Sequence, residues 1–523
     1  MKKIHNLDAL LAIIVLVVFG FVFIYYAASS VRFGVHWDEF RIIQSIQATM
    51  TTGVVLPGWY NYPSLSYLIG LITLIVSSIP DIISAKVDNP LGLHLAEISG
   101  QPAFRYLLRT VFVCLTAATA TFTMLATRMA GTSWLAAALS GAILLSSFQV
   151  FYHSRWIAPD TLLMLACAMT LSASLWAVRK QRGFSLVLAS IAAGLAVASK
   201  YTGGCLIFLP LFVALRNSAR LSRVAIVVFV YFLTYIMITP GTVITPLRFL
   251  GDLFYEMSHY GKLGHRMFTV DPGFDHLEKI VDFLLFRISS QYWGMALFVF
   301  LSAIAGGFFA WRKLRWNSGL LIIIPVMYVF YLSSNTVMSV RNLLLLMPFI
   351  AVLAAIALDS IVKLTKTNLV HNAALLLFAA LLTLNWPIFQ HAANSIQDRD
   401  PGLWIKSINS YIVDHPGEKF ALSPKVSRLL GDSRNDGQIT DRLEEANAYL
   451  FALSENEKNI LEKRQITNRR NLYTVIAGAD DVDLDYYPNW SGLDRIVVVS
   501  SATAKWIAPY LIDDEQMTKR FER

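Results

Sequence analysis

The chain has 523 residues, of which 55% are hydrophobic and only 15% charged, and its mean hydropathy is +0.53. A soluble domain carries about a quarter of charged residues, so the composition excludes a purely soluble protein and indicates a polytopic membrane protein with one soluble part. The formal charge is +9, but the basic residues cluster in short loops between apolar segments, which is typical of a topology signal and not of a nucleic-acid-binding surface.

Eleven apolar runs are long enough to cross a bilayer. They lie at 8–28, 105–127, 132–151, 161–178, 184–199, 204–215, 224–240, 291–310, 318–334, 342–362 and 369–388. The first run follows a short basic N-terminus, and no small-residue cleavage site follows Tyr26, so we expect an uncleaved membrane helix and not a signal peptide. The three cysteines lie inside apolar runs and indicate small core residues with no disulfide framework or metal motif: Cys114, Cys167 and Cys205.

A further run, 64–80, is of marginal length for a span, and the distribution of basic loops decides its role. Those loops are at the N-terminus and at 178–182, 216–223, 311–316 and 363–368. If the N-terminus is cytoplasmic and 64–80 does not span, all five loops are cytoplasmic, whereas a spanning 64–80 moves four of them outside. We therefore predict that 64–80 is an interfacial or partly re-entrant helix on the outer side, and that the C-terminus is also outside.

The segment "FGVHWDEFRIIQ" places Asp38 and Glu39 side by side, shortly after the first apolar run. One interpretation is local: the aspartate opens a surface helix and the glutamate lies in its first turn. The other is chemical, because a carboxylate near the lipid boundary is costly and can act as a general base when partial desolvation raises its pKa. The residues alone leave both interpretations open.

Tyrosines precede the proline that begins the next helix, in "YNYPSLSYLIG". Proline is well suited to the first turn of a helix because its missing N–H is not needed there. By residue type, Tyr60 and Tyr62 are best interpreted as interfacial anchors.

A second external turn, "FYHSRWIAPDTLL", contains His153, Arg155 and Asp160. Asp160 follows a proline and precedes a span, so helix capping explains it as well as chemistry does. Two external turns that each place an aspartate at the start of a helix favour a shared site more than either turn alone.

Two cations stand at the outer ends of spans. Lys200 lies in "ASKYTGG" beside Tyr201. Its side chain either snorkels to the membrane interface or contacts a phosphate, and the sequence leaves both interpretations open. Arg341, in "MSVRNLLLLMPFIAVLAA", breaks the positive-inside trend, which favours a local anionic partner. In the outer loop 241–290, His259 and neighbouring basic residues lie either over a phosphate site or in solvent, and their spacing is not that of a zinc site.

The chain changes character at about residue 389. Strand-like runs at 419–423, 471–479 and 494–502 alternate with helical patterns such as 441–464, which predicts a small α/β domain. We therefore expect a transmembrane catalytic domain at 1–388 and a soluble extracytoplasmic domain at 389–523. The sequence of the tail contains no glycine-rich phosphate loop and no evident catalytic triad. We therefore expect a substrate-selecting or packing module and not a second enzyme.

These motifs, taken in order, resemble those of the GT-C fold glycosyltransferases, in the branch of the dolichyl-phosphate-mannose–protein mannosyltransferases and the lipid A aminoarabinose transferases. The resemblance covers about residues 1–390. It rests on the Asp38–Glu39 pair, "YPSLSYLIG", Arg105 in "FRYLLRTVF", "SRWIAPDTLL", "ASKYTGG" and "VRNLLLLMPFIAVLAA". The implied fold is a polytopic α-helical membrane protein with about 11 transmembrane helices and external juxtamembrane helices.

The resemblance implies a polyprenyl-phosphate-linked sugar donor and a lipid, glycan or protein acceptor, with inversion at the anomeric carbon. Asp38 is then the expected general base, Glu39 a support of the loop, and Asp160 a positioning group. The residues expected to bind substrate are Tyr62, His153, Arg155, Lys200, Tyr201, His259 and Arg341. Since many relatives have a basic residue where this chain has Tyr62, we expect Lys200 or Arg341 to supply the phosphate contact.

Several functional questions remain open at the level of sequence. Oligosaccharyl relatives need a divalent ion and the monosaccharide branch does not, and the chain shows no clear set of metal ligands. An oligosaccharide or polymer ligase with a lipid-diphosphate donor is the rival enzyme, and a transporter or lipid flippase the rival non-enzyme. No internal repeat of the transporter kind is evident. The expected location is the bacterial inner membrane, with the active site on the outer side.

Overall fold

The structure, a computed structural model, describes residues 2–33, 36–84, 90–181, 183–216, 220–264, 268–364 and 367–397, together with four strands in the C-terminal region. The chain divides into two compact units. The first consists of residues 1–31 and 36–390, and the second of residues 32–35 and 391–523.

Most of the chain up to residue 397 is helical, because its long runs of leucine, isoleucine, valine and alanine satisfy the backbone internally in an apolar environment. The first helices are α1 (Lys2–Ser29), α2 (Trp37–Thr52), α3 (Leu65–Ile83), α4 (Leu91–Gly100), α5 (Pro102–Met129), α6 (Trp134–Ser146), α7 (Phe148–Ser154), α8 (Pro159–Lys180) and α9 (Gly183–Ser199). They are followed by α10 (Phe208–Leu215), α11 (Arg220–Ile238), α12 (Gly241–Ile244), α13 (Pro246–Ser258), α14 (Phe274–Phe286), α15 (Trp293–Leu314), α16 (Gly319–Ser333), α17 (Met347–Val362), α18 (Asn368–Leu382) and α19 (Trp386–Gln397). Tighter 3-10 turns precede α10 and α17, at Tyr201–Ile207 and Val340–Leu346.

Among the described residues, eight helical runs are long and apolar enough to cross a membrane, or nine if α6 and α7 form one span broken by a bend of 61°. Each of the eleven predicted spans coincides with helix. The number of runs differs from eleven for three reasons. Gly183–Ser199 and Tyr201–Leu215 are shorter than a span, and α15 and α16 form one run of 41 residues. In addition, α3 is itself long and apolar enough to cross a membrane. The chain is therefore a multi-pass helical membrane protein, and the number of eleven crossings stays a prediction.

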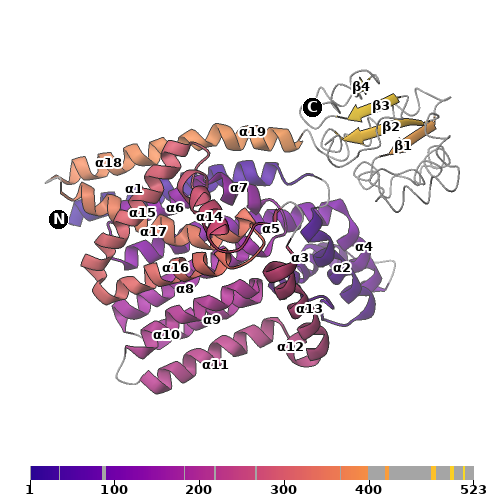
Figure 1. Cartoon of the computed structure of the whole chain (residues 1–523), viewed down its shortest axis with the longest axis horizontal. Helices are drawn as coiled ribbons and strands as arrows, with labels where there is room; N and C mark the ends of the chain where they lie inside the picture. Colours follow the sequence, from indigo (N-terminus) through magenta and orange to yellow (C-terminus); the bar gives the residue numbers. More distant parts are fainter. Residues whose placement is uncertain are drawn as a thin grey trace. The chain divides into compact units, whose positions relative to one another are not determined.

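The end of α1 and the start of α5 lie together. Arg109, near the start of α5, donates a hydrogen bond of 2.6 Å from Nη1 to the backbone oxygen of Val31. This contact requires an even number of crossings between the two helices, so α3 cannot by itself carry the chain to the other end of the bundle. Figure 1 shows α2, α3 and α4 gathered at one end of the long helices, together with α12 and α13. The arrangement favours the interfacial position predicted for 64–80.

One face of α3 holds this end of the bundle together. Tyr67, Leu71 and Leu74 are buried in a core cluster that also contains Phe104 and Leu108 of α5 and residues of α2, α4 and α8. Full burial of each such side chain contributes roughly 1.5–3 kcal/mol to stability. The cluster therefore fixes α2, which carries the acidic pair, against the first turns of α5.

The turn between α7 and α8 is set by proline chemistry. Ala158 is extended, and Pro159 occupies the first turn of α8, where its fixed φ suits the helix. The next residue, Asp160, therefore lies in the first helical turn and is 2% exposed. The backbone N–H of Ile157 donates to Glu39 Oε1 at 2.9 Å, which ties this turn to α2.

The second unit contains a four-stranded sheet in the order β1 (Lys419–Leu422), β2 (Tyr473–Gly478), β3 (Arg495–Val499) and β4 (Tyr510–Ile512). The first three strands are parallel, with Ala421 opposite Val475 and Val475 opposite Ile496. The last strand is antiparallel to β3. The three strand-like runs of the tail form strands. The helix predicted at 441–464 lies outside the described residues, so an α/β domain remains a prediction.

Candidate active site

Four segments that are distant in the sequence contribute charged side chains to one cluster, which we call the four-charge cluster: Asp38, Asp160, Lys200 and Arg341. Arg341 joins the two carboxylates, because its Nη1 pairs with Asp38 Oδ2 and its Nε lies 3.8 Å from Asp160 Oδ2. Lys200 Nζ pairs with the other oxygen of Asp160 at 2.6 Å. Two carboxylates and two cations therefore meet, and their formal charges balance.

Lys200 points into the protein and not toward solvent. It is 5% exposed, and its Nζ donates to Asp160 Oδ1 and to Asn342 Oδ1, each at 2.6 Å. The ring of Tyr260 lies 5.9 Å from the same nitrogen. Tyr328 donates to the backbone oxygen of Asn342 at 2.9 Å, which fixes the segment that carries this asparagine. Snorkelling to the interface therefore does not describe Lys200.

Asp38 owes its position to the first turn of α2. His36 caps the helix, with Nδ1 accepting the Asp38 N–H at 3.3 Å, and Glu39 completes a capping box from the third helical position. Burial lowers the pKa of His36 below its ordinary value of 6.5, although Asp38 and Glu39 oppose that shift. The neutral imidazole can therefore serve as the acceptor in the cap.

Glu39 has a different environment, although it is adjacent in the sequence. Its side chain is 0% exposed and forms a two-point ion pair with Arg109, with distances of 2.8 Å and 2.6 Å. The backbone N–H groups of His36 and Ile157 also donate to it, at 3.1 Å and 2.9 Å. Both oxygens are thus occupied by protein donors, which is the geometry of a carboxylate that holds α2 to α5 and to the turn before α8.

Of the two tyrosines predicted to bind substrate, Tyr62 contacts the four-charge cluster and Tyr201 contacts the loop that carries Tyr62. Tyr62 OH accepts a hydrogen bond of 3.3 Å from Arg341 Nη2, and burial raises the pKa of this phenol well above its ordinary value of 10.0. Tyr201 OH donates to the backbone oxygen of Tyr60, whose N–H donates to Asp252 Oδ2 of α13 at 2.8 Å. The loop before α3 is therefore held on one side by the 3-10 turn that begins at Tyr201 and on the other by α13. This position brings Tyr62 to Arg341.

His153 and Arg155 are buried beside the cluster, at 6% and 1% exposure. The imidazole of His153 meets the ring of Trp156 edge-on, with centroids 4.9 Å apart. The guanidinium of Arg155 lies over the rings of Phe151 and Tyr152, at 4.9 Å and 5.0 Å. Aromatic faces stabilise a cation in this arrangement.

His259 lies in the loop 241–290, in a short π-helix that spans His259–Leu263, and its ring stacks on Tyr255. It directly precedes Tyr260, whose ring approaches Lys200. Backbone bonds join this loop to the segment that leads to Arg341: the Thr336 N–H donates to Tyr260 O, and the Val270 N–H donates to Thr336 O, both at 2.8 Å. Residues 265–267 of the loop lie outside the described residues.

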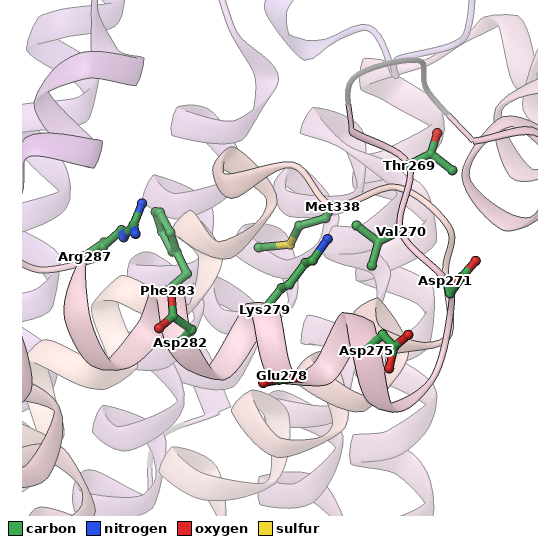
Figure 2. Close-up of a pocket in the computed structure, with 10 residues that line it drawn as sticks. All are labelled: Thr269, Val270, Asp271, Asp275, Glu278, Lys279, Asp282, Phe283, Arg287 and Met338. Atoms are coloured by element: carbon green, nitrogen blue, oxygen red, sulfur yellow. The ribbon is translucent and has the colours of Figure 1, made fainter.

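A pocket beside this loop is lined by α14 and by both joined segments. Figure 2 shows Lys279 extending from α14 toward Met338, with the other lining residues along the same helix and the loop before it. The lining residues are Thr269, Val270, Asp271, Asp275, Glu278, Lys279, Asp282, Phe283, Arg287 and Met338. None of them belongs to the four-charge cluster.

Metal ligation has no support from the residues that the structure describes, which contain no group of three or more His, Cys, Asp or Glu side chains able to hold an ion. The three cysteines are free thiols.

The sequence analysis missed Arg109, Asn342 and Trp156. The motif "FRYLLRTVF" drew attention to Arg105, but the arginine that pairs with Glu39 is Arg109, one turn further along α5. A buried arginine inside an apolar run is itself a signal, because such a charge needs a partner. Asn342 and Trp156 carry no comparable signal in the sequence.

Comparison with known proteins gives a consistent result for the membrane part. Residues 97–244 match the family model described as dolichyl-phosphate-mannose-protein mannosyltransferase. No curated protein sequence matches the chain.

Solved structures match over most of the length. ArnT from Cupriavidus metallidurans bound to undecaprenyl phosphate matches with a TM-score of 0.54 and 12% identity, over 93% of this chain and 95% of that protein. ArnT in the apo state matches with a TM-score of 0.53 and 11% identity, over 88% and 90%. The archaeal oligosaccharyltransferase AglB from Archaeoglobus fulgidus matches with a TM-score of 0.48 and 12% identity, over 93% and 69%. The chain thus has the GT-C fold and resembles the mannosyltransferase and aminoarabinose transferase group, as its ordered motifs predicted.

Proposed function

We propose that the chain is an integral membrane glycosyltransferase of the inner bacterial membrane, which moves a sugar from a polyprenyl-phosphate-linked donor to an acceptor hydroxyl on the outer face. The observation that carries this proposal is the four-charge cluster, in which a partly exposed carboxylate stands beside two cations. The match to the mannosyltransferase family model supports it, as does the fold shared with ArnT, a protein solved with undecaprenyl phosphate bound.

Asp38 is the general base of the proposed reaction. Its side chain is 14% exposed, which leaves it accessible to an acceptor, and Arg341 is its ion-pair partner. The carboxylate takes the proton of the acceptor hydroxyl as the oxygen forms a bond to the anomeric carbon. The bond from that carbon to the phosphate oxygen breaks, and the polyprenyl phosphate leaves with the electron pair. Attack opposite to the leaving group gives inversion.

Arg341 and Lys200 stabilise the leaving phosphate. A phosphate is already a competent anionic leaving group, so the protein need not protonate it but must match its charge with cations placed beforehand. A guanidinium offers paired N–H groups to phosphate oxygens, whereas an ammonium acts as a point charge. Asp160 orients both cations through its two oxygens, which lie 2.6 Å from Lys200 Nζ and 3.8 Å from Arg341 Nε.

The remaining predicted residues bind substrate around these groups. Tyr62 contacts Arg341 and keeps its proton, so it can donate to a phosphate or sugar oxygen. Tyr201 holds the loop that presents Tyr62. Arg155, His153 and His259 line the approaches from α7 and from the outer loop. Glu39 positions α2 and therefore Asp38.

The experiment uses membranes that contain the full chain, a panel of radiolabelled polyprenyl-phosphate sugars, and the variant Asp38→Asn. At least one lipid should give a labelled glycosylated product, and Asp38→Asn should lower the rate by about 10²–10⁴-fold, the range expected for loss of a general base. Asp282→Asn, the same change at an exposed carboxylate outside the cluster, is the matched control and should transfer normally.

Normal transfer by Asp38→Asn would exclude Asp38 as the base. A diphosphate lipid product that depends on added metal would favour an oligosaccharide or polymer ligase. Movement of the lipid without any covalent product, unaffected by the substitution, would favour a transporter or flippase.

A further inference from the structure

Within and beside the four-charge cluster lie buried polar atoms that form no hydrogen bond, although one of them, Asp160 Oδ2, lies 3.8 Å from Arg341 Nε. His153, Trp156 and Asp160 are 6%, 5% and 2% exposed. Both ring nitrogens of His153, the Nε1 of Trp156 and the Oδ2 of Asp160 make no hydrogen bond with any residue that the structure describes. Such atoms are rare in folded proteins, and each deserves an explanation.

The aromatic members of this patch touch one another, and the charge of Asp160 acts on the imidazole of His153. The rings of His153 and Trp156 meet with centroids 4.9 Å apart and an interplanar angle of 82°, and the ring of His36 stacks on Trp156 at 4.5 Å and 6°. His36 Nδ1 in turn lies 3.8 Å from Asp38 Oδ2. One stacked imidazole therefore separates the patch from the proposed base, while Asp160 connects it with Arg341.

Burial of a polar group without a partner costs about 1–3 kcal/mol, so these atoms require partners beyond those that the described residues provide. The kind of partner follows from their chemistry. A neutral imidazole offers one donor and one acceptor, an indole offers one donor, and a carboxylate oxygen offers an acceptor. This mixture does not match an anion, which only accepts. It matches alcohol groups, which donate and accept at once.

The aromatic rings restrict the kind of ligand that could bind this patch. The rings of Trp156, His36 and His153 lie together with these polar atoms, and the C–H groups of a ring can pack on aromatic surface. A compact ring that carries several hydroxyl groups satisfies both requirements. Phosphate is better served by Arg341 and Lys200, which already define the cationic side of the site.

We propose that His153, Trp156 and Asp160 Oδ2 form a subsite that hydrogen-bonds the hydroxyl groups of a sugar ring, so that this patch selects the sugar. The inference rests on the proposed function, and it names the substrate portion that the patch recognises. The ring belongs to the donor lipid or to a glycan acceptor, since both present the same chemistry.

The experiment compares His153→Phe with wild type, because phenylalanine keeps the aromatic packing and removes both nitrogens. Binding is measured for undecaprenyl phosphate, undecaprenyl-phosphate mannose and undecaprenyl-phosphate aminoarabinose. Wild type should bind at least one sugar-bearing lipid more tightly than the carrier alone. His153→Phe should weaken that binding about 5- to 30-fold, leave the affinity for undecaprenyl phosphate unchanged, and not lower the Tm. Trp156→Phe, which removes one N–H, should give about a two- to fivefold loss.

His371→Phe is the matched control, since His371 is also buried, at 7%, and its Nε2 faces Asp359 of α17 at 3.4 Å, outside the patch. It should leave sugar recognition intact. An unchanged donor affinity with a raised KM for acceptor in His153→Phe would assign the subsite to the acceptor sugar.

The inference is overturned if His153→Phe changes neither the affinity for the sugar-bearing lipid nor the KM for acceptor. It is also overturned if His153→Phe weakens the binding of undecaprenyl phosphate as much as that of the sugar-bearing lipid, or if wild type prefers no sugar-bearing lipid over the carrier. The failure of the proposed function looks different: wild type would bind a sugar-bearing lipid selectively but form no glycosylated product, and the comparison of affinities would still test the patch.

Discussion

Asp38 and Glu39 are neighbours in the chain, and they belong to two different kinds of site. Glu39 is fully buried, and four N–H groups, two of Arg109 and two of the backbone, donate to its oxygens. Asp38 is 14% exposed and pairs with Arg341 from a distant segment. A carboxylate whose acceptors are all occupied by the protein can support structure but cannot take a proton from substrate. The comparison favours a supporting role for Glu39 and leaves Asp38 accessible, as the proposed function requires.

The largest expected effect is on the supporting pair. Arg109→Met leaves the Glu39 carboxylate buried without a cation, although two backbone N–H groups still donate to it, and breaking a buried ion pair costs about 3–5 kcal/mol. We expect loss of most folded protein, or a fall in Tm of roughly 4–6 °C in detergent, measured by thermal unfolding. The double variant Arg109→Met/Glu39→Leu replaces both members of the pair by apolar residues. It should recover part of the stability that Arg109→Met alone loses.

The control for this prediction is Arg248→Met, which breaks an exposed ion pair with Asp252 at 3.3 Å. Exposed pairs contribute about 0–1 kcal/mol, so its Tm should stay close to that of wild type. Equal effects of the two substitutions would contradict the structural role of Glu39.

The second effect separates chemistry from stability. Under the proposed function, Arg341→Gln removes a cation that stabilises the leaving phosphate, and it should lower kcat/KM about 10²–10³-fold, as removal of a preorganised charge-stabilising donor does. The Tm should change little, because Asp38 is partly exposed and can be hydrated when its partner is lost. Arg287→Gln, at an exposed arginine of the α14 pocket, should transfer normally. A large fall in Tm with unchanged kcat/KM would reverse the assignment.

The smallest effect concerns pH and the cap of α2. The lowered pKa of His36 means that the native state resists its protonation, so the capped conformation loses stability as pH falls below 6.5 and continues to do so until the native pKa is passed. His36→Asn keeps a capping acceptor without a proton to gain. Wild type should therefore lose about two- to threefold more activity than His36→Asn between pH 7 and pH 5.

His391→Asn, at an exposed histidine, should follow the wild-type pH profile in the same assay. Identical profiles of wild type and His36→Asn would show that the cap does not influence Asp38.

The sequence was sufficient to predict that one site brings together four charged residues: Asp38, Asp160, Lys200 and Arg341. Loop charges place the ends of their spans on one side, and residues at one end of a small bundle converge. The difference between Asp38 and Glu39 was not within reach, since both are acids in the same helical turn. It depends on Arg109, whose guanidinium reaches Glu39 only because α3 packs α2 against α5.

The aromatic patch was beyond the sequence for a related reason. His153 is visible as a polar residue near a turn, but the orientation of its ring against Trp156 depends on how the chain folds back between α7 and α8. The strands of the tail were predicted from their valine- and isoleucine-rich runs, whereas their parallel order depends on long-range pairing that local patterns do not encode.

Arg341 cannot give the same N–H groups to a carboxylate and to a phosphate. Under the proposed function, the arriving lipid head competes with Asp38 for this guanidinium and releases the carboxylate as it binds. The acceptor alcohol then meets a free proton acceptor only after the donor is seated. Steady-state kinetics should therefore be ordered, with the lipid as the leading substrate.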